Sequence, residues 1–378
     1  MKLAIPKERM AEEPRVAATP DTVKKLVGLG FDVAVETGAG EKSHISDAAY
    51  TEAGATVAGS SADALKDADV VFAVRGPDDE QLGCLKKGAV LAAILNPYGD
   101  KERIQKYADA GIVAIAMEFM PRITRAQSMD VLSSQSNLAG YKAVIEAANT
   151  FDKAMPMMMT AAGTVAPARV FVFGAGVAGL QAIATAKRLG AIVSATDVRR
   201  AAGEQIESLG GTFIMVDADD EDGETEAGYA KEMSEDYKRR QAELVSEHIK
   251  KQDIVITTAL IPGRPAPVLV SEDMVKSMKP GSIIVDLAVE QGGNCPLSKP
   301  GEIVEAHGVK IIGHRNMAGR LPVDASSLYA KNLLNFITPQ IDQEAKALTL
   351  DWEDETVTGT ALTRDGAIIH PALTGETA

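Results

Sequence analysis

A short apolar run that leads into three spaced glycines constrains this chain more than any other feature. Residues 170–173, Val-Phe-Val-Phe, precede Gly174-Ala-Gly176-Val-Ala-Gly179, and a helix-forming segment follows at once. In a strand–turn–helix unit, the first glycine permits a tight turn and the second lets a pyrophosphate approach the backbone. The third lets the helix pack closely on the strand, and the helix N-terminus offers N–H groups to phosphates. The pattern predicts a dinucleotide-binding turn.

A carboxylate after the next predicted strand indicates which dinucleotide fits. Residues 191–196 form a second apolar run, which ends at Asp197, eighteen residues after Gly179. A carboxylate there can accept both hydroxyls of the adenosine ribose and repels a 2′-phosphate, which favours NAD(H) over NADP(H). Arg199 and Arg200 follow immediately and soften that repulsion. A glycine-rich turn that binds no ligand is the alternative interpretation.

Length and charge narrow the class of protein further. The chain has 378 residues, enough for two ordinary domains. Its formal net charge of −14 argues against nucleic acid as a partner and against direct docking on anionic lipid. It has no apolar run of membrane-spanning length and no signal-peptide layout at its N-terminus. Cys84 and Cys295 are isolated and no metal-ligand spacing appears, so we expect a cytosolic chain with no metal site.

The alternation of apolar runs and helical segments predicts the fold class. Parallel strands joined by crossover helices are expected when short strands and helices alternate. The expected strands are residues 3–5, 32–36, 70–74, 90–94, 113–117, 170–173, 192–196, 212–216, 254–258, 283–287 and 310–312. The expected helices of the first set are residues 20–29, 47–53, 61–66 and 101–110. We predict an α/β fold with two doubly wound, Rossmann-like parallel-sheet domains, separated by a cleft and joined by long helices.

Two helical patterns mark where the domains join. One covers residues 133–154, with Ser133 or Ser134 as its N-cap, and the other covers residues 326–337. The chain is therefore expected to return to the first domain near its C-terminus, where residues 356–362 and 367–370 are expected to be short strands. The predicted domains are residues 1–134 with 314–378, and residues 135–313.

Two segments stand apart from this alternation. Residues 217–226 carry a run of acidic side chains, which repel one another and bury no apolar area, so we expect a mobile surface excursion there. Residues 155–162 are short, apolar and rich in methionine. We expect them to pack against other parts of the protein and not to form a membrane segment.

A polar segment after a predicted strand end is a second candidate site. Residues 121–137 are dense in hydrogen-bonding side chains, and open α/β sheets bind ligands beyond the carboxyl ends of their strands. Arg122 and Asp130 can hold each other or a polar ligand. Gln127 offers a donor and an acceptor to a carboxamide, and Ser133 offers a hydroxyl. A hydrogen-bonded capping loop without a ligand explains the same residues.

The whole chain resembles a known family. It is similar, end to end, to the soluble NAD(H)-binding subunit (domain I) of bacterial proton-translocating NAD(P) transhydrogenase, in the form whose α subunit is split. The stretches that carry this resemblance most specifically are residues 122–142, 156–187, 257–267, 285–296 and 331–339. Together they are far more specific than the glycine pattern alone.

The resemblance implies an activity and partners. NAD(H) would bind in the interdomain cleft, and hydride would pass from NADH to NADP⁺ held by an NADP(H)-binding domain on a partner subunit, in a transhydrogenase of the Si/Re-specific type. Membrane-spanning transhydrogenase subunits would couple the transfer to proton translocation. The chain would be a homodimer, without direct membrane insertion, held at the cytoplasmic face of the inner membrane through those subunits.

The resemblance also implies site residues. Those expected around the nicotinamide are Arg122, Gln127, Asp130, Val131, Leu132 and Ser133, of which Arg122, Gln127, Asp130 and Ser133 would orient the ring for catalysis. Those expected at the pyrophosphate are Gly174, Ala175, Gly176, Val177, Ala178 and Gly179. Those expected at the adenosine are Asp197, Val198, Arg199, Ala259 and Leu260. Gly228 and Tyr229 would belong to a mobile loop, about residues 217–236, which closes over the nucleotide.

Two other functions remain open. Alanine dehydrogenases are similar to this family, but their Lys-Val-Lys-Glu-Pro segment corresponds here to residues 73–77, where Ala73 replaces the first lysine. Their acid/base histidine has no counterpart near residues 96–98, and losing a general base costs roughly two to four orders of magnitude in rate. Arg75 can still grip an anion. A non-catalytic NAD(H)-sensing module is the third possibility.

Overall fold

The chain folds into two compact units. A computed structural model describes residues 1–216, 235–342 and 344–375. Unit 1 comprises Met1–Gln135 and Ala318–Ala378, and unit 2 comprises Ser136–Met317. The predicted mobile-loop residues Gly228 and Tyr229 lie outside the described residues. No described helix combines the length and the apolar content needed to cross a membrane.

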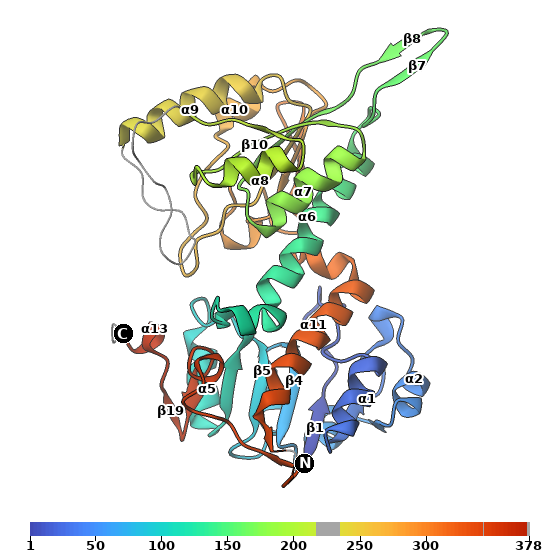
Figure 1. Ribbon diagram of the computed structural model, residues 1–378, viewed down its shortest axis with the longest axis vertical. Coiled ribbons are helices and arrows are strands. Elements are labelled where there is room, and N and C mark those ends of the chain that lie inside the picture. Colours follow the sequence, from blue (N-terminus) through green and yellow to red (C-terminus); the bar gives the residue numbers. More distant parts are fainter. Residues whose placement is uncertain (217–234, 343, 376–378) are drawn as a thin grey trace. The chain divides into compact units, whose positions relative to one another are not determined.

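Unit 1 is built on a six-stranded parallel sheet in the order β3-β2-β1-β4-β5-β6. Figure 1 labels three of these strands, β1, β4 and β5. Leu3 of β1 lies opposite Val33 of β2 and Val70 of β4. The strands are β1 (Lys2–Ile5), β2 (Asp32–Glu36), β3 (Thr56–Ala58), β4 (Val70–Arg75), β5 (Val90–Ile94) and β6 (Val113–Ala116). The helices are α1 (Pro20–Gly28), α2 (Asp47–Glu52), α3 (Ser61–Leu65), α4 (Asp79–Leu82), α5 (Lys101–Asp109), α11 (Pro322–Ile337), α12 (Glu355–Thr358) and α13 (Pro371–Thr374).

Unit 2 is built on a seven-stranded sheet in the order β11-β10-β9-β12-β13-β15-β14. Val170 of β9 lies opposite Val193 of β10 and Ile254 of β12, and only β14 runs antiparallel to its neighbour. The strands are β9 (Arg169–Phe173), β10 (Ile192–Thr196), β11 (Thr212–Phe213), β12 (Ile254–Thr257), β13 (Ile283–Asp286), β14 (Ile303–Ala306) and β15 (Val309–Ile312). The helices that flank it are α7 (Val177–Arg188), α8 (Ala202–Ser208), α9 (Glu235–Ile249) and α10 (Glu272–Ser277).

Each sheet is apolar on both faces, because helices cover both. In unit 1, Ile5 and Phe72 belong to one buried cluster, and Ala4 and Leu91 belong to another. In unit 2, Val170 and Phe171, adjacent on β9, likewise belong to different clusters. Strands buried on both faces are typical of parallel α/β sheets, and they explain the continuous apolar runs in the sequence. The predicted α/β class, with two Rossmann-like parallel-sheet units, is confirmed.

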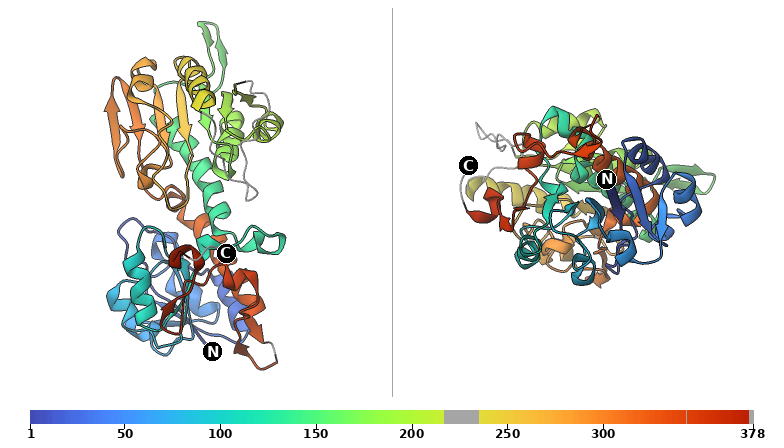
Figure 2. Two further views of the ribbon diagram at one scale, coloured as in Figure 1. Left: turned by 90° about the vertical axis from the view of Figure 1, so that its left-hand side faces the viewer. Right: turned by 90° about the horizontal axis from the view of Figure 1, so that it is seen from below.

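Most of the methionine-rich segment is exposed, contrary to the prediction that it packs against other parts of the protein. It forms a hairpin of β7 (Met158–Thr160) and β8 (Gly163–Val165), which extends away from the sheet of unit 2 (Figures 1 and 2). Met157, Met158 and Met159 are exposed, and only Met155, at its base, is buried. Paired strands satisfy each other's backbone hydrogen bonds without a core, so apolar composition alone was misleading here.

Two other local predictions are also wrong. The helix expected at residue 133 begins earlier, as α6 (Val131–Thr150), and neither Ser133 nor Ser134 caps it. Instead the Asp130 carboxylate accepts the backbone N–H of Ser133 at 2.9 Å, as an N-cap side chain does. In the C-terminal segment, residues 356–362 were expected to be a strand, but α12 occupies their start.

Candidate functional site

The glycine-rich turn of unit 2 joins β9 to α7. Gly174 has a φ of +91°, in the region that favours glycine, and a Cβ there would lie 2.5 Å from the Thr258 hydroxyl oxygen. That hydroxyl donates to the carbonyl of Phe173 at 2.9 Å, so the start of the turn is tied to the end of β12. The turn is therefore held on the sheet by its own strand and by the neighbouring one.

The other two glycines are constrained in different ways. A Cβ at Gly179 would lie 1.8 Å from the carbonyl oxygen of Gly174, so the close packing of α7 on the turn admits only glycine. A Cβ at Gly176 would have no described atom within 4 Å, and its φ of −75° suits any residue. The described residues would therefore leave room for a side chain at position 176. No described side chain caps the N-terminus of α7, whose first-turn N–H groups face that space as possible anion donors.

A fourth glycine, which the sequence reading missed, supports this turn. A Cβ at Gly140, in α6, would lie 2.0 Å from the carbonyl oxygen of Ala178. Helix α6 therefore approaches the first turn of α7 to backbone contact. A glycine inside a long helical pattern was the only sequence signal for this contact, since glycine weakens a helix interior.

Asp197 lies directly after β10, as predicted, and its carboxylate faces the turn. Its Oδ2 accepts the backbone N–H of Ala175 at 2.7 Å. Its Oδ1 accepts the backbone N–H of Arg199 at 2.8 Å, and the Arg199 guanidinium bonds both oxygens, with Nε–Oδ1 at 2.9 Å and Nη2–Oδ2 at 3.0 Å. The structure thus brings Asp197, Arg199 and the turn together. Val198, between them, is half-buried.

The predicted adenosine border follows β12. Ala259 is half-buried and Leu260 is 45% exposed. The backbone of Ala259 is held by the side chain of Asn294, which accepts its N–H at 3.2 Å and donates to its carbonyl at 2.9 Å. Both predicted residues therefore lie beyond the carboxyl end of the strand that neighbours β9, where open parallel sheets bind ligands.

The predicted nicotinamide-side residues lie in unit 1, around the 3₁₀ helix η3 (Thr124–Met129) and the start of α6. Arg122 and Gln127 are exposed, and no hydrogen bond to a described residue uses the Gln127 amide. Asp130 accepts both the N–H of Ser133 and its hydroxyl, the latter at 2.5 Å. Of the first two residues of α6, Val131 is buried and Leu132 is 45% exposed.

Two neighbouring groups hold this segment in place. Asn332 of α11 donates to the carbonyl of Ser128 at 2.8 Å and accepts the Ser134 hydroxyl at 2.7 Å. Arg125 pairs with Asp354 at 2.6 Å and 2.8 Å, and that arginine holds the pKa of the aspartate well below its ordinary value. Gln127 therefore lies on a segment that hydrogen bonds hold in place, and its own amide makes no hydrogen bond to a described residue.

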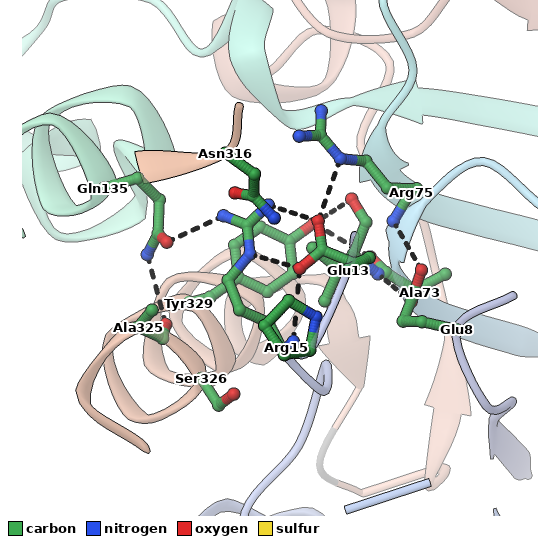
Figure 3. Close-up of polar contacts among 12 residues, drawn as sticks. Glu8, Glu13, Arg15, Ala73, Arg75, Gln135, Asn316, Ala325, Ser326 and Tyr329 are labelled. Atoms are coloured by element: carbon green, nitrogen blue, oxygen red, sulfur yellow. Dashed lines mark hydrogen bonds and ion pairs between the residues drawn. The ribbon is translucent and has the colours of Figure 1, made fainter. Parts of the chain in front are cut away.

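A buried charged cluster in unit 1 was missed by sequence reasoning (Figure 3). Arg15 binds Glu13 through Nε at 2.7 Å and Nη2 at 2.6 Å, and donates to Gln135 at 2.8 Å. Arg75 joins it through a 3.1 Å contact to Glu13. Arg75, which the sequence left free to grip an anion, is thus already paired. The sequence of residues 6–15 looks like solvated surface, and residues 9–12 are exposed. Only tertiary packing buries Glu13 and Arg15.

Glu8 completes this cluster at the carboxyl end of β4. Its carboxylate accepts the N–H of Val74 at 2.6 Å and that of Arg75 at 3.2 Å. Burial raises the pKa of Glu8 to about 8, although these bonds favour the ionised form. For Glu13, burial acts in the same direction, but the hydrogen bonds and charges of Arg15 and Arg75 outweigh it and lower its pKa.

The cluster lies at the topological switch point of the sheet of unit 1, where the strand order reverses. Strands β1 and β4 are neighbours, and the chain winds outward from them in both directions, which makes their carboxyl ends the expected ligand crevice of a doubly wound sheet. In this chain that position carries ion pairs and backbone hydrogen bonds among Glu8, Glu13, Arg15 and Arg75. The Tyr329 hydroxyl of α11 also reaches the end of β4, where it donates to the carbonyl of Ala73 at 2.8 Å.

Comparison with known proteins agrees with this architecture. Residues 4–139 match the family described as alanine dehydrogenase/PNT, N-terminal domain, and residues 143–371 match alanine dehydrogenase/PNT, C-terminal domain. This chain belongs to the alanine dehydrogenase/PNT family.

Within the alanine dehydrogenase/PNT family, the close homologues are transhydrogenase subunits. The chain is 61% identical, over the whole of both chains, to the first segment of the split alpha subunit of NAD(P) transhydrogenase from Rhodospirillum rubrum. A solved structure of transhydrogenase from Sinorhizobium meliloti is 56% identical with a TM-score of 0.89, covering 98% of this chain and all of that one. Alanine dehydrogenase of Halomonas elongata is 31% identical, covering 99% of this chain and 96% of the relative. The resemblance inferred from the sequence is confirmed.

Proposed function

We propose that this chain binds NAD(H) and is the component of an NAD(P) transhydrogenase that delivers hydride from NADH to NADP⁺. The glycine-rich turn of unit 2 would receive the adenosine and pyrophosphate, and the η3–α6 segment of unit 1 would receive the nicotinamide. We also propose that the two units are the two domains expected from the sequence. The names and identities of the relatives favour a transhydrogenase subunit over an alanine dehydrogenase.

One observation carries the nucleotide-binding half of the proposal: Gly176. The described chain gives no steric or conformational reason for glycine at this position, since a Cβ would meet nothing within 4 Å. A phosphate that approaches the backbone supplies such a reason, and the first-turn N–H groups of α7 would hold it. Gly174 and Gly179, by contrast, are explained by the fold itself.

The side chains have distinct tasks in this proposal. Asp197 would accept the ribose hydroxyls, and Val198, Arg199, Ala259 and Leu260 would surround the adenosine. Arg122, Gln127, Asp130 and Ser133 would orient the ring. When bound, the nicotinamide supplies the hydride, so the protein needs no general acid or base, and orientation is its contribution to the rate.

Substitution of the glycines separates a ligand requirement from a folding requirement. Gly176→Ala should leave the unfolding temperature of the protein close to wild type and weaken NADH binding at least tenfold in calorimetric titration, because its methyl group enters the phosphate space. Gly179→Ala should lower the unfolding temperature, because its Cβ collides with the carbonyl of Gly174. A Gly176→Ala protein that binds NADH as tightly as wild type would contradict the proposal.

The reaction is tested with an NADP(H)-binding partner domain. The mixture should reduce an NAD⁺ analogue at the expense of NADPH, or the reverse, while the chain alone should not oxidise alanine with NAD⁺. Alanine-dependent NADH formation at a robust rate would favour the amino acid oxidoreductase instead. Tight NADH binding with no transfer in the mixture would favour the sensing module.

We propose that membrane-spanning transhydrogenase subunits and an NADP(H)-binding domain complete the enzyme, which places the chain at the cytoplasmic face of the inner membrane through those subunits. We also propose a homodimer, supported by the exposed hairpin β7–β8, because contiguous exposed apolar side chains mark protein contacts. Met159→Glu should shift sedimentation toward the monomer, whereas Met10→Glu, at an exposed methionine of unit 1, should not.

A further inference from the structure

Asn294 is buried, with no solvent-exposed surface, and both its side-chain amide and its backbone carbonyl bond one neighbouring segment. Its Oδ1 accepts the N–H of Ala259, and its Nδ2 donates to the carbonyl of Ala259 at 2.9 Å and to that of Pro267 at 2.8 Å. Its own carbonyl accepts the N–H groups of Leu269 and Val270 at 2.9 Å and 3.0 Å. One residue thus closes both ends of the segment that follows β12.

The clamped segment carries exposed apolar side chains. Leu260 and Ile261 are 45% and 43% exposed, although Thr258, just before them, is tied to the glycine-rich turn through Phe173. The segment therefore borders the proposed nucleotide site. Its shape is set by backbone bonds to Asn294, and one further bond joins the N–H of Ala266 to the carbonyl of Gln291 at 2.8 Å.

Asn294 is itself held by a glycine turn and a buried carboxylate. Gly293 has a φ of +80°, and a Cβ there would lie 2.7 Å from a carboxylate oxygen of Asp286 and 2.6 Å from the Ser298 hydroxyl. Asp286, fully buried at the end of β13, accepts the N–H of Cys295 at 3.1 Å and the Ser298 hydroxyl at 2.6 Å. This anchoring ties the place of Asn294 to the sheet rather than to a free loop.

We propose that Asn294 is a positioning residue of the nucleotide site, which holds residues 259–267 in the shape that receives the adenosine end of the cofactor. The inference rests on the proposed NAD(H) function. Asn294 touches no nucleotide itself; it acts through the backbone of Ala259 and Pro267. Because both a donor and an acceptor are needed at Ala259, neither a carboxylate nor an alkyl group can replace the amide.

The test compares Asn294→Asp and Asn294→Ala with a matched control. Gln252 is also buried in unit 2, and its side chain donates to a backbone carbonyl, that of His248, but it precedes β12 and so lies at the opposite end of that strand. Gln252→Ala should lower the unfolding temperature without altering ligand affinity. Each Asn294 variant should bind ADP-ribose and NADH at least tenfold more weakly in calorimetric titration, with reduced nicotinamide mononucleotide binding within twofold of wild type.

A rate measurement separates positioning from general loosening. With the NADP(H)-binding partner, Asn294→Asp should raise the KM for NADH and leave the rate at saturating NADH within twofold, because the hydride leaves from the other end of the cofactor. If the Asn294 variants do not fold, Ser298→Ala, which loosens the same turn, should weaken ADP-ribose binding by about threefold.

The outcomes divide cleanly. Wild-type affinity for ADP-ribose in the folded Asn294 variants, or an equal loss in Gln252→Ala, would overturn the positioning role while leaving the proposed function intact. Unchanged binding by Ser298→Ala, where only that variant folds, would do the same. A wild-type chain that binds neither ADP-ribose nor NADH would overturn both.

Discussion

Arg199 covers the carboxylate of Asp197, with its Nε 2.9 Å from Oδ1 and its Nη2 3.0 Å from Oδ2. Such two-pronged pairs are among the stronger charge-assisted hydrogen bonds in proteins. The carboxylate proposed to accept the ribose hydroxyls is therefore already engaged by the chain. A nucleotide must share it with the guanidinium or displace the guanidinium, so both residues should control nucleotide preference.

Asp197→Ala should weaken NADH binding and narrow its advantage over NADPH. Removing the acceptor of the ribose hydroxyls costs about 1–3 kcal/mol, roughly 5- to 150-fold in affinity. The substitution also releases the Arg199 guanidinium, which can then attract a 2′-phosphate. Titration with both nucleotides checks this, and an unchanged affinity ratio would remove Asp197 from the ribose site.

Arg199→Ala should act in the opposite direction on selectivity. Without the guanidinium, the carboxylate of Asp197 stands unneutralised beside the ribose, so NADPH should bind more weakly while NADH binds as tightly as wild type or more so. The control is Arg188→Ala, an exposed arginine in the last turn of α7. If Arg199→Ala improved NADPH binding, the guanidinium would not be acting as a counter-ion for a 2′-phosphate.

Gln127→Ala should slow hydride transfer far more than it weakens NADH binding. The Gln127 amide is exposed and free of hydrogen bonds to described residues, so its loss should not disturb the fold. An effect on ring orientation lowers the rate at saturating substrate, whereas an ordinary ground-state contact raises KM alone. Gln105→Ala, at an exposed glutamine of α5 that bonds Asp109, is the control and should change neither quantity.

Glu8→Gln should change how stability depends on pH. Burial raises the pKa of Glu8 to about 8, from an ordinary value of 4.5, so between those values the folded chain holds a proton that the unfolded chain has lost. This contribution to stability is complete below pH 4.5 and is lost as pH rises toward 8, by at most about 1.4 kcal/mol per pH unit.

A glutamine stays neutral at every pH. The unfolding free energy of Glu8→Gln should therefore rise relative to that of wild type as the pH increases from about 5 to about 8.5. Denaturant titrations at several pH values measure the difference, with the exposed Glu52→Gln as control. A constant difference across that range would mean that Glu8 does not take up a proton in the folded protein.

The sequence predicted those strands whose side chains are buried on both faces of a sheet. The predicted apolar runs became strands, because the strands of a parallel sheet that is covered on both faces are apolar along their length. Two edge strands, β3 and β14, were not predicted, because they are short and mix polar with apolar residues, whereas the edge strands β6 and β11 were predicted. The prediction for the hairpin β7–β8 was wrong because its two strands bond each other through the backbone, so its methionines need not be buried.

The site was only partly predictable. Spacing alone located the glycine turn and Asp197, because both act through local backbone geometry. It did not reveal the Arg199–Asp197 pair, which depends on a side-chain rotamer, or Asn294, whose partners lie 24 to 35 residues away. The helix cap was also ambiguous, because Asp130, Ser133 and Ser134 all suit a cap and only the backbone path selects Asp130.

The ion pair between Glu13 and Arg15 has a consequence for how this fold can change over generations. Both side chains are almost wholly shielded from water, and losing one of two such charges typically destabilises a protein by about 3–5 kcal/mol, a large share of its total stability. A single replacement at either residue would therefore destabilise the folded protein, and selection would tend to remove it. Conversion of this crevice to another chemistry would therefore require paired replacements, or a stabilising background acquired beforehand.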